Sequence, residues 1–306
     1  STKAARTDLP KMVLLADLVA DDEELVADAA DWVVALTQAR EGEAFIAISP
    51  EARRRFWLDR ARTAAISRHT NAFKINEDVV IPLERLADYS RAIERINIEQ
   101  SIANKQRIAR ALLAYVEGEM AEARAWPGFE DSVEAQAILD DKREAARTVL
   151  EKTHKRWGQI LALLDAQASD HLQLLLEPEQ ARVKADDRLI DLLIRRDLRQ
   201  SLRLEVRQRL DEIFSGQDMA AVRERFGDIH AQVREARLFV ALHMHAGDGN
   251  VHTNIPVHSA DYAMLQEADR IVARIMALAT ALGGVISGEH GIGLTKIRFL
   301  EPDKLS

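Results

Sequence analysis

The chain has 306 residues, 47% of them hydrophobic, which is enough for one large domain or two modest ones. It contains no cysteine, so disulfides and thiolate-held metal or iron–sulfur centres are excluded within this chain, and any metal must use histidine and carboxylate ligands. The 42 Lys and Arg against 50 Asp and Glu give a net charge of -8, which argues against a nucleic-acid partner. No apolar stretch reaches the ~20 residues of a membrane span and no signal-peptide pattern begins the chain, so we expect a cytoplasmic protein.

The first hundred residues predict an alternation of strands and helices. Short apolar runs with β-branched residues are typical of buried strands, whereas apolar residues at helical spacing after an acidic start are typical of helices. We therefore expect strands at 12–19, 44–48 and 79–81, and helices from the acidic residues 21–24 to about Gly42, from 51 to 68, and after Pro82.

The middle of the chain, residues 101–235, has a different composition. It is rich in Ala, Leu, Arg, Glu, Gln and Asp and contains few strand-forming residues. We interpret it as an inserted bundle of helices, whose charged residues form solvated faces and pairs four residues apart.

The strand signal returns at Arg237. Apolar and polar residues alternate, and a glycine-rich turn follows, so residues 238–255 predict a β-hairpin. We expect a long amphipathic helix from Ser259 to the glycines 283–284, then a strand at 285–287 and a loop at 288–293.

Histidines gather in the last quarter of the chain, at positions 243, 245, 252, 258 and 290. The hairpin brings His245 and His252 together, and a return of the chain to the sheet can bring Glu289 and His290 to the same edge. A single histidine is more often a hydrogen-bonded structural residue. Two glycine-rich turns that carry His and Glu are poorly explained by packing, however, because glycine weakens a sheet. Two imidazoles and a carboxylate suit a divalent ion such as zinc, manganese or iron, with open positions for a substrate.

Both glycine-rich segments resemble the signature motifs of a known family. Residues 245–252 (HAGDGNVH) and 287–293 (SGEHGIG) are similar to those of the FAD-linked oxidase C-terminal domain. This is the cap domain of D-lactate dehydrogenases, the glycolate oxidase D subunit and D-2-hydroxyglutarate dehydrogenase. The resemblance implies that His245, His252 and Glu289 bind a divalent metal and that His290 is the general base.

A further part of the resemblance lies in the first hundred residues. The segment FWLDR at 56–60, and Lys74 ahead of VVIP at 79–82, look like the family's substrate-arginine and lysine segment. The resemblance implies that Arg60 and Lys74 pair with a substrate carboxylate, although Arg62 is an alternative to Arg60.

The remaining site residues follow from the same resemblance. It implies that Asn254 hydrogen-bonds the substrate or helps to frame the site, and that Asn250 and Gly288 contact the cofactor. The implied reaction oxidises a D-2-hydroxy acid of the D-lactate or glycolate class to the 2-oxo acid. The metal lowers the pKa of the hydroxyl, His290 takes its proton, and FAD accepts the hydride.

The resemblance also implies a domain organisation. Residues 1–100 and 236–306 form the cap domain and 101–235 the insertion, while an FAD-binding domain precedes Ser1 in the same polypeptide. The spacing and the insertion look most like very large bacterial oxidoreductases with an additional iron–sulfur domain, so that cluster is expected outside this chain. The expected partners are a small 2-hydroxy acid, the FAD domain and an unknown electron acceptor. A homo-oligomer is compatible with this domain organisation, and so is a peripheral place of the full-length protein at the inner face of the membrane.

For the fold we predict the α+β class: a mostly antiparallel, ferredoxin-like sheet with helices on one face and a large all-helical insertion. Two other functions stay open. A self-sufficient metallohydrolase could use the same ligands to activate water, and an assembly module could hold a purely structural metal.

Overall fold

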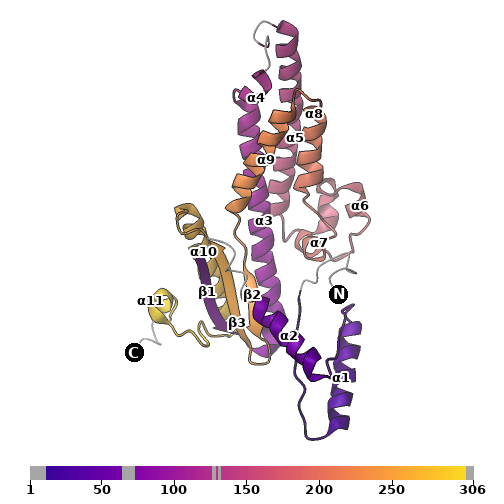
Figure 1. The fold of residues 1–306 in the computed structure, drawn as a ribbon, viewed down its shortest axis with the longest axis vertical. Coiled ribbons are helices and arrows are strands. Elements are labelled where there is room, and N and C mark those ends of the chain that lie inside the picture. Colours follow the sequence, from indigo (N-terminus) through magenta and orange to yellow (C-terminus); the bar gives the residue numbers. More distant parts are fainter. Residues whose placement is uncertain (1–11, 64–72, 126–128, 130–131, 301–306) are drawn as a thin grey trace. The chain divides into compact units, whose positions relative to one another are not determined.

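The computed structural model describes residues 12–63, 73–125, 129 and 132–300, with the side chains of 59–63 and 73 excepted (Figure 1). Two compact units divide the chain, residues 1–70 and 71–306. None of the helices in the described ranges is long and apolar enough to cross a membrane. In chain order the elements are α1 (Glu23–Gln38), α2 (Pro50–Thr63), β1 (Phe73–Val80), η3 (Leu83–Arg85), α3 (Leu86–Glu117), α4 (Ala121–Arg124), α5 (Val133–Ala162), η4 (Ala168–Leu174), α6 (Glu177–Gln180), α7 (Leu189–Arg195), the π-helix η5 (Leu202–Arg207), α8 (Gln208–Ile213), α9 (Ala220–Glu235), β2 (Ala241–His245), β3 (Asn250–Val257), α10 (Tyr262–Ala281), α11 (Gly293–Lys296) and η6 (Ile297–Phe299).

The first unit contains the helices α1 and α2, as the sequence predicts. Helix α1 begins at Asp22, whose side chain accepts a hydrogen bond from the Glu24 N–H and so satisfies a free donor of the first turn. The prediction of strands at 12–19 and 44–48 is wrong, because neither segment pairs with a strand among the described residues. A strand requires a hydrogen-bonding neighbour, and apolar composition alone does not supply one.

The second unit is built on a three-stranded antiparallel sheet in the order β1-β3-β2. Side chains alternate between its two faces, and β3 turns Val251, Ile255 and Val257 into the core. Helices α3 and α10 contribute to the same core cluster, which leaves the other face of the sheet polar. The predicted hairpin is confirmed, and the predicted strand at 79–81 is longer, since it begins at Phe73.

Helix α10 covers the sheet and returns the chain to it. It begins after Asp261, whose side chain accepts a hydrogen bond from the Met264 N–H, so the helix starts later than the predicted start at Ser259. The predicted glycine stop is confirmed: Gly283 adopts a φ of 76°, in the left-handed region that favours glycine. Val285 then forms an antiparallel bridge with Val80, which places the following loop at the end of β1.

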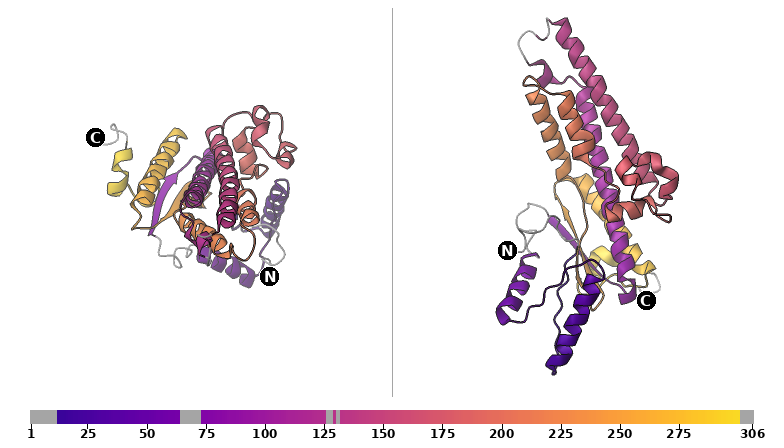
Figure 2. Two further views of the ribbon diagram at one scale, coloured as in Figure 1. Left: turned by 90° about the horizontal axis from the view of Figure 1, so that it is seen from above. Right: turned by 90° about the vertical axis from the view of Figure 1, so that its right-hand side faces the viewer.

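The region between β1 and β2 is almost wholly helical, as predicted, and α3 joins it to the sheet (Figures 1 and 2). The first half of this 32-residue helix contributes Tyr89 and Ile93 to the sheet core, and its second half contributes Ile108 and Leu112 to a separate helical core. The prediction of an α+β fold with an antiparallel sheet and a large helical part is thereby confirmed.

A buried ion-pair network ties the helical elements together. Arg156 of α5 donates to Glu205 of the π-helix over 2.6 Å and to Glu179 of α6 over 2.9 Å, and all three side chains are largely buried. Removing one partner of such a network leaves buried charges uncompensated, so the network is expected to be important for the stability of this region.

Candidate metal centre

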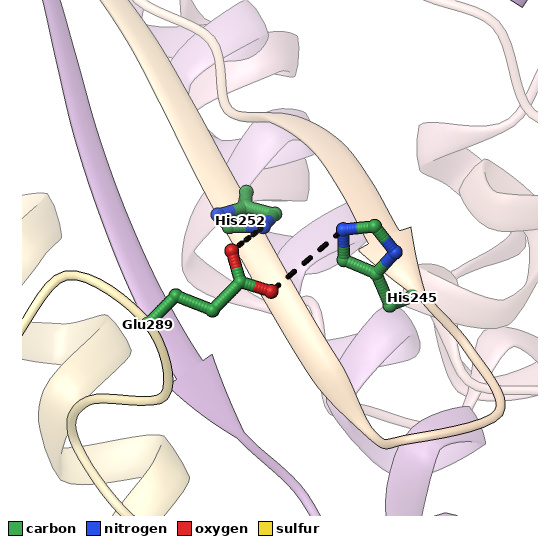
Figure 3. Close-up of side chains that lie close together, drawn as sticks. All are labelled: His245, His252 and Glu289. Atoms are coloured by element: carbon green, nitrogen blue, oxygen red, sulfur yellow. Dashed lines mark ion pairs between the residues drawn. The ribbon is translucent and has the colours of Figure 1, made fainter.

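The polar face of the sheet, opposite the core, is called the open face and carries the histidines of the hairpin. The loop after α10 brings a carboxylate to them (Figure 3). His245 lies at the end of β2 and His252 in β3, and Glu289 reaches toward both from the loop. The Nε2 atom of His245 lies 3.8 Å from Oε1 of Glu289, and Nε2 of His252 lies 3.6 Å from Oε2. The ligand atoms of the three residues all lie within 4.8 Å of one another.

These separations fit a divalent cation. Ligand atoms bonded to one ion at ~2.0 to 2.2 Å lie roughly 3 to 3.6 Å from each other in a tetrahedral site, close to the observed nitrogen–oxygen distances. Burial lowers the pKa of His252, although Glu289 opposes this effect, so burial favours the neutral form of the ring. A neutral imidazole is the form that binds metals.

Unsatisfied polar atoms also gather at this end of the sheet. Buried atoms without a hydrogen-bond partner in the described part of the chain include Asn250 Oδ1, His252 Nδ1, Asn254 Oδ1 and Ser287 Oγ. Because a buried polar atom without a partner costs free energy, such a group points to a site that is completed by a bound species or water.

Asn250 and Gly288, which the family resemblance assigns to cofactor binding, help to hold the loop that carries the Glu289 carboxylate. The Asn250 side-chain amide donates to Oε1 of Glu289 over 2.7 Å. A Cβ on Gly288 would lie 2.8 Å from Asn250 Oδ1 and 2.9 Å from Cγ2 of Val80, so the loop can approach the strand this closely only with glycine. Contact of Asn250 or Gly288 with a cofactor stays a prediction.

His290 lies next to the candidate ligands. Its ring centroid is 5.2 Å from that of His252, and its Nδ1 atom lies 3.5 Å from Oδ1 of Asp78. Nε2 is therefore the nitrogen of His290 that does not face Asp78.

Asp78 and Lys296 are two residues that the sequence analysis did not single out. Asp78 is completely buried in β1 and accepts hydrogen bonds from Lys296 Nζ and from the backbone N–H groups of 288–290. Burial alone raises the pKa of this carboxyl, but the hydrogen bonds from Lys296 and the loop outweigh it and hold the pKa far below its usual value. An acidic residue directly before the apolar run Val79–Ile81 was the signal in the sequence, although its partner 218 residues away gives no local sign.

The predicted substrate residues are brought together only in part. Asn254 shares the open face with His252, two residues along β3. Lys74 pairs with Pro256 in register and lies on this face as well, four residues along β1 from Asp78, or about 13 Å.

The remaining candidates are two arginines of the first unit and two further histidines of the second. Arg60 and its alternative Arg62 belong to α2, and their side chains fall outside the described residues. His258 follows β3 at the end away from the candidate ligands. His243, by contrast, lies directly opposite His252 in the strand register, with ring centroids 6.3 Å apart.

The chain belongs to a recognised family of flavoenzyme domains. Residues 4–117 and 216–304, more than half of the chain, match the family described as FAD linked oxidases, C-terminal domain. The unmatched stretch lies within the helical insertion. Family membership predicted from the two glycine-rich motifs is thus confirmed.

Several characterised relatives are similar over shorter segments. A D-lactate dehydrogenase of Archaeoglobus fulgidus is 36% identical over 118 residues, which is 39% of this chain and 25% of that protein. The glycolate oxidase subunit GlcD of Escherichia coli K12 is 43% identical over 60 residues, 20% of this chain and 12% of the relative. A mitochondrial D-lactate dehydrogenase [cytochrome] of Arabidopsis thaliana is 37% identical over 59 residues, 19% of this chain and 10% of that enzyme. These matches span a quarter or less of each relative, and no solved structure matches.

Proposed function

We propose that this chain is the metal- and substrate-binding part of an FAD-dependent dehydrogenase that oxidises a D-2-hydroxy acid of the D-lactate or glycolate class to the 2-oxo acid. The observation that carries the proposal is the convergence of His245, His252 and Glu289, with His290 beside them. Family membership and relatives named D-lactate dehydrogenase and glycolate oxidase support the flavin and the substrate class.

His245, His252 and Glu289 would hold the divalent ion. When bound, this ion lowers the pKa of a coordinated hydroxyl and polarises it. The separation of the three ligand atoms supports this role, and so does the lowered pKa of His252, which favours the neutral ring. Zinc, manganese and iron all accept this combination of imidazole and carboxylate ligands.

His290 would accept the proton of the substrate hydroxyl at Nε2, because Nδ1 faces Asp78. A bound FAD would supply a two-electron acceptor, and the 2-hydroxy acid would lose one proton and one hydride in total. Lys74 on the open face would pair with the substrate carboxylate, and Asn254 would hydrogen-bond the substrate or help to frame the site. Pairing of Arg60, or its alternative Arg62, with the carboxylate stays a prediction from the family resemblance.

The metal assignment is tested by elemental analysis of the purified natural protein. His245→Ala and His252→Ala are each expected to lower the content of zinc, manganese or iron. His258→Ala is the matched control, because His258 directly follows β3 at the end away from the site, and it should leave the metal content unchanged. Unchanged metal in both ligand variants would contradict the assignment.

Turnover is tested with the same natural protein, D-lactate or glycolate, and a dye as electron acceptor. His290→Ala should abolish dye reduction while the metal stays bound. Hydrolysis of esters or phosphate esters in place of dye reduction would contradict the proposal and support a hydrolase. A metal with four protein ligands and no turnover would support a structural role.

A further inference from the structure

Asp78 is a carboxylate in the interior of the protein whose two oxygens face different partners. Oδ2 accepts hydrogen bonds from three successive backbone N–H groups, those of Gly288 at 2.6 Å, of Glu289, and of His290 at 3.2 Å. Oδ1 accepts from Lys296 Nζ over 2.7 Å and lies 3.5 Å from the His290 ring. One side chain of β1 thus holds the backbone of the whole 288–290 segment.

Lys296 completes this arrangement from α11. Its side chain is 2% exposed, and its ammonium group also donates to the backbone oxygen of Asp78 over 2.9 Å, while a Glu77 carboxylate oxygen lies 3.4 Å away. Two buried charges are therefore paired with each other and further hydrogen-bonded. A pair of this kind is retained in an interior only where its geometry is good.

Asp78 accepts the hydrogen bonds of three successive backbone N–H groups of this loop. The loop is also anchored by the Val80–Val285 bridge before it and by the close packing of Gly288 against Asn250 and Val80. Glu289 and His290 are exposed, and the only hydrogen bond described for the Glu289 side chain comes from Asn250. The hydrogen bonds to Asp78 therefore hold the part of the backbone that carries both side chains.

We propose that Asp78 and Lys296 form a positioning pair that fixes the 288–290 loop, so that the Glu289 carboxylate and the His290 ring both face His252. The inference rests on the proposed metal centre. Asp78 contacts neither metal nor substrate in this role: it acts through the loop, as residues hydrogen-bonded to metal ligands commonly do. The three N–H groups alone would leave the negative charge of Asp78 without a counter-charge in the interior. The ammonium group of Lys296 supplies that counter-charge.

The pair is tested in the natural protein with three variants. Asp78→Asn removes the charge but keeps the size of the side chain. Asp78→Asn combined with Lys296→Met also removes the buried ammonium that would lose its partner. Asp269→Asn is the matched control, because it breaks the exposed ion pair between α10 and Arg298, two residues from Lys296.

Two measurements are made on each variant. Equilibrium dialysis against Zn²⁺ with elemental analysis gives the metal affinity. Hydrogen exchange of the metal-free protein, followed by mass spectrometry of a peptide covering 286–294, reports the protection of the three loop N–H groups.

Asp78→Asn is expected to weaken Zn²⁺ binding about 10- to 100-fold and to speed exchange in the loop peptide. The double variant should recover thermal stability but not Zn²⁺ affinity, a result that a purely structural pair would not give. Zn²⁺ affinity within twofold of wild type and unchanged loop exchange in both variants would overturn the proposal. If the wild type fails to bind Zn²⁺, the proposed metal centre is wrong, and loop exchange alone then decides whether Asp78 positions the loop.

Discussion

Gly249, in the hairpin turn between the two candidate ligand strands, is the position where a single added methyl group should have the largest effect. Its φ is 71°, and a Cβ there would lie 2.1 Å from the carbonyl oxygen of Ile81. The Ile81 N–H also donates to the Gly249 carbonyl over 2.9 Å. For Gly249→Ala we expect a loss of about 3 to 5 kcal/mol in the free energy of unfolding: about 1 to 2 from the left-handed backbone, and the rest from the displaced chain and the weakened hydrogen bond.

Two other glycines separate these contributions. Gly216 has a φ of 95° with open space around its Cβ position, so Gly216→Ala should cost only about 1 to 2 kcal/mol. A Cβ on Gly247, in the same turn as Gly249, also meets nothing within 4 Å and has no positive φ, so Gly247→Ala should change stability by less than about 0.5 kcal/mol. Urea denaturation of the three variants measures the differences. If Gly249→Ala is no less stable than Gly216→Ala, the reasoning from the close approach to Ile81 is refuted.

Three further predictions concern the loop, the insertion and pH. Gly288→Ala should displace the Asn250 side chain and lower Zn²⁺ affinity about tenfold, as measured by equilibrium dialysis, with Gly247→Ala as the control. Arg156→Met should lower the free energy of unfolding by about 3 to 5 kcal/mol, because both buried carboxylates that it bridges lose their cationic partner, and Zn²⁺ affinity should not change; urea denaturation with dialysis tests both. Hydrogen bonds from Arg195 hold the pKa of Asp187 below its usual value, so the stability from this pair is present above about pH 4 and is lost as pH falls through the lowered pKa. Between about pH 5 and pH 2, the free energy of unfolding of Asp187→Asn should therefore fall less than that of the wild type, as measured by urea titrations. An unchanged pH profile would contradict this.

The parts of the fold that the sequence predicts correctly depend on local patterns. The hairpin follows from alternating residues around a glycine-rich turn, and the end of α10 follows from the glycines at 283–284. Turn chemistry and periodicity act within a few residues, so they can be recognised without the rest of the chain. The same locality explains why the strand predictions at 12–19 and 44–48 are wrong: both runs are apolar, but a strand also needs a partner, which local sequence does not reveal.

The candidate site also has a part that local sequence predicts and a part that depends on the tertiary structure. The sequence by itself identified His245, His252 and Glu289 as candidates, because core packing does not explain His and Glu residues within two glycine-rich segments. Their separation of less than 5 Å was decided by the tertiary structure, in which the loop after α10 returns to the end of β1.

The support beneath the site could be seen only in the tertiary structure. Asp78 and Lys296 are 218 residues apart, and nothing in either stretch of sequence indicates that the two residues pair. Their meaning comes from complete burial and from the three loop N–H groups that Asp78 accepts. Composition and motif therefore determined the family and the candidate ligands, whereas long-range packing decided which buried charges hold those ligands in place, because burial and pairing are properties of the folded chain.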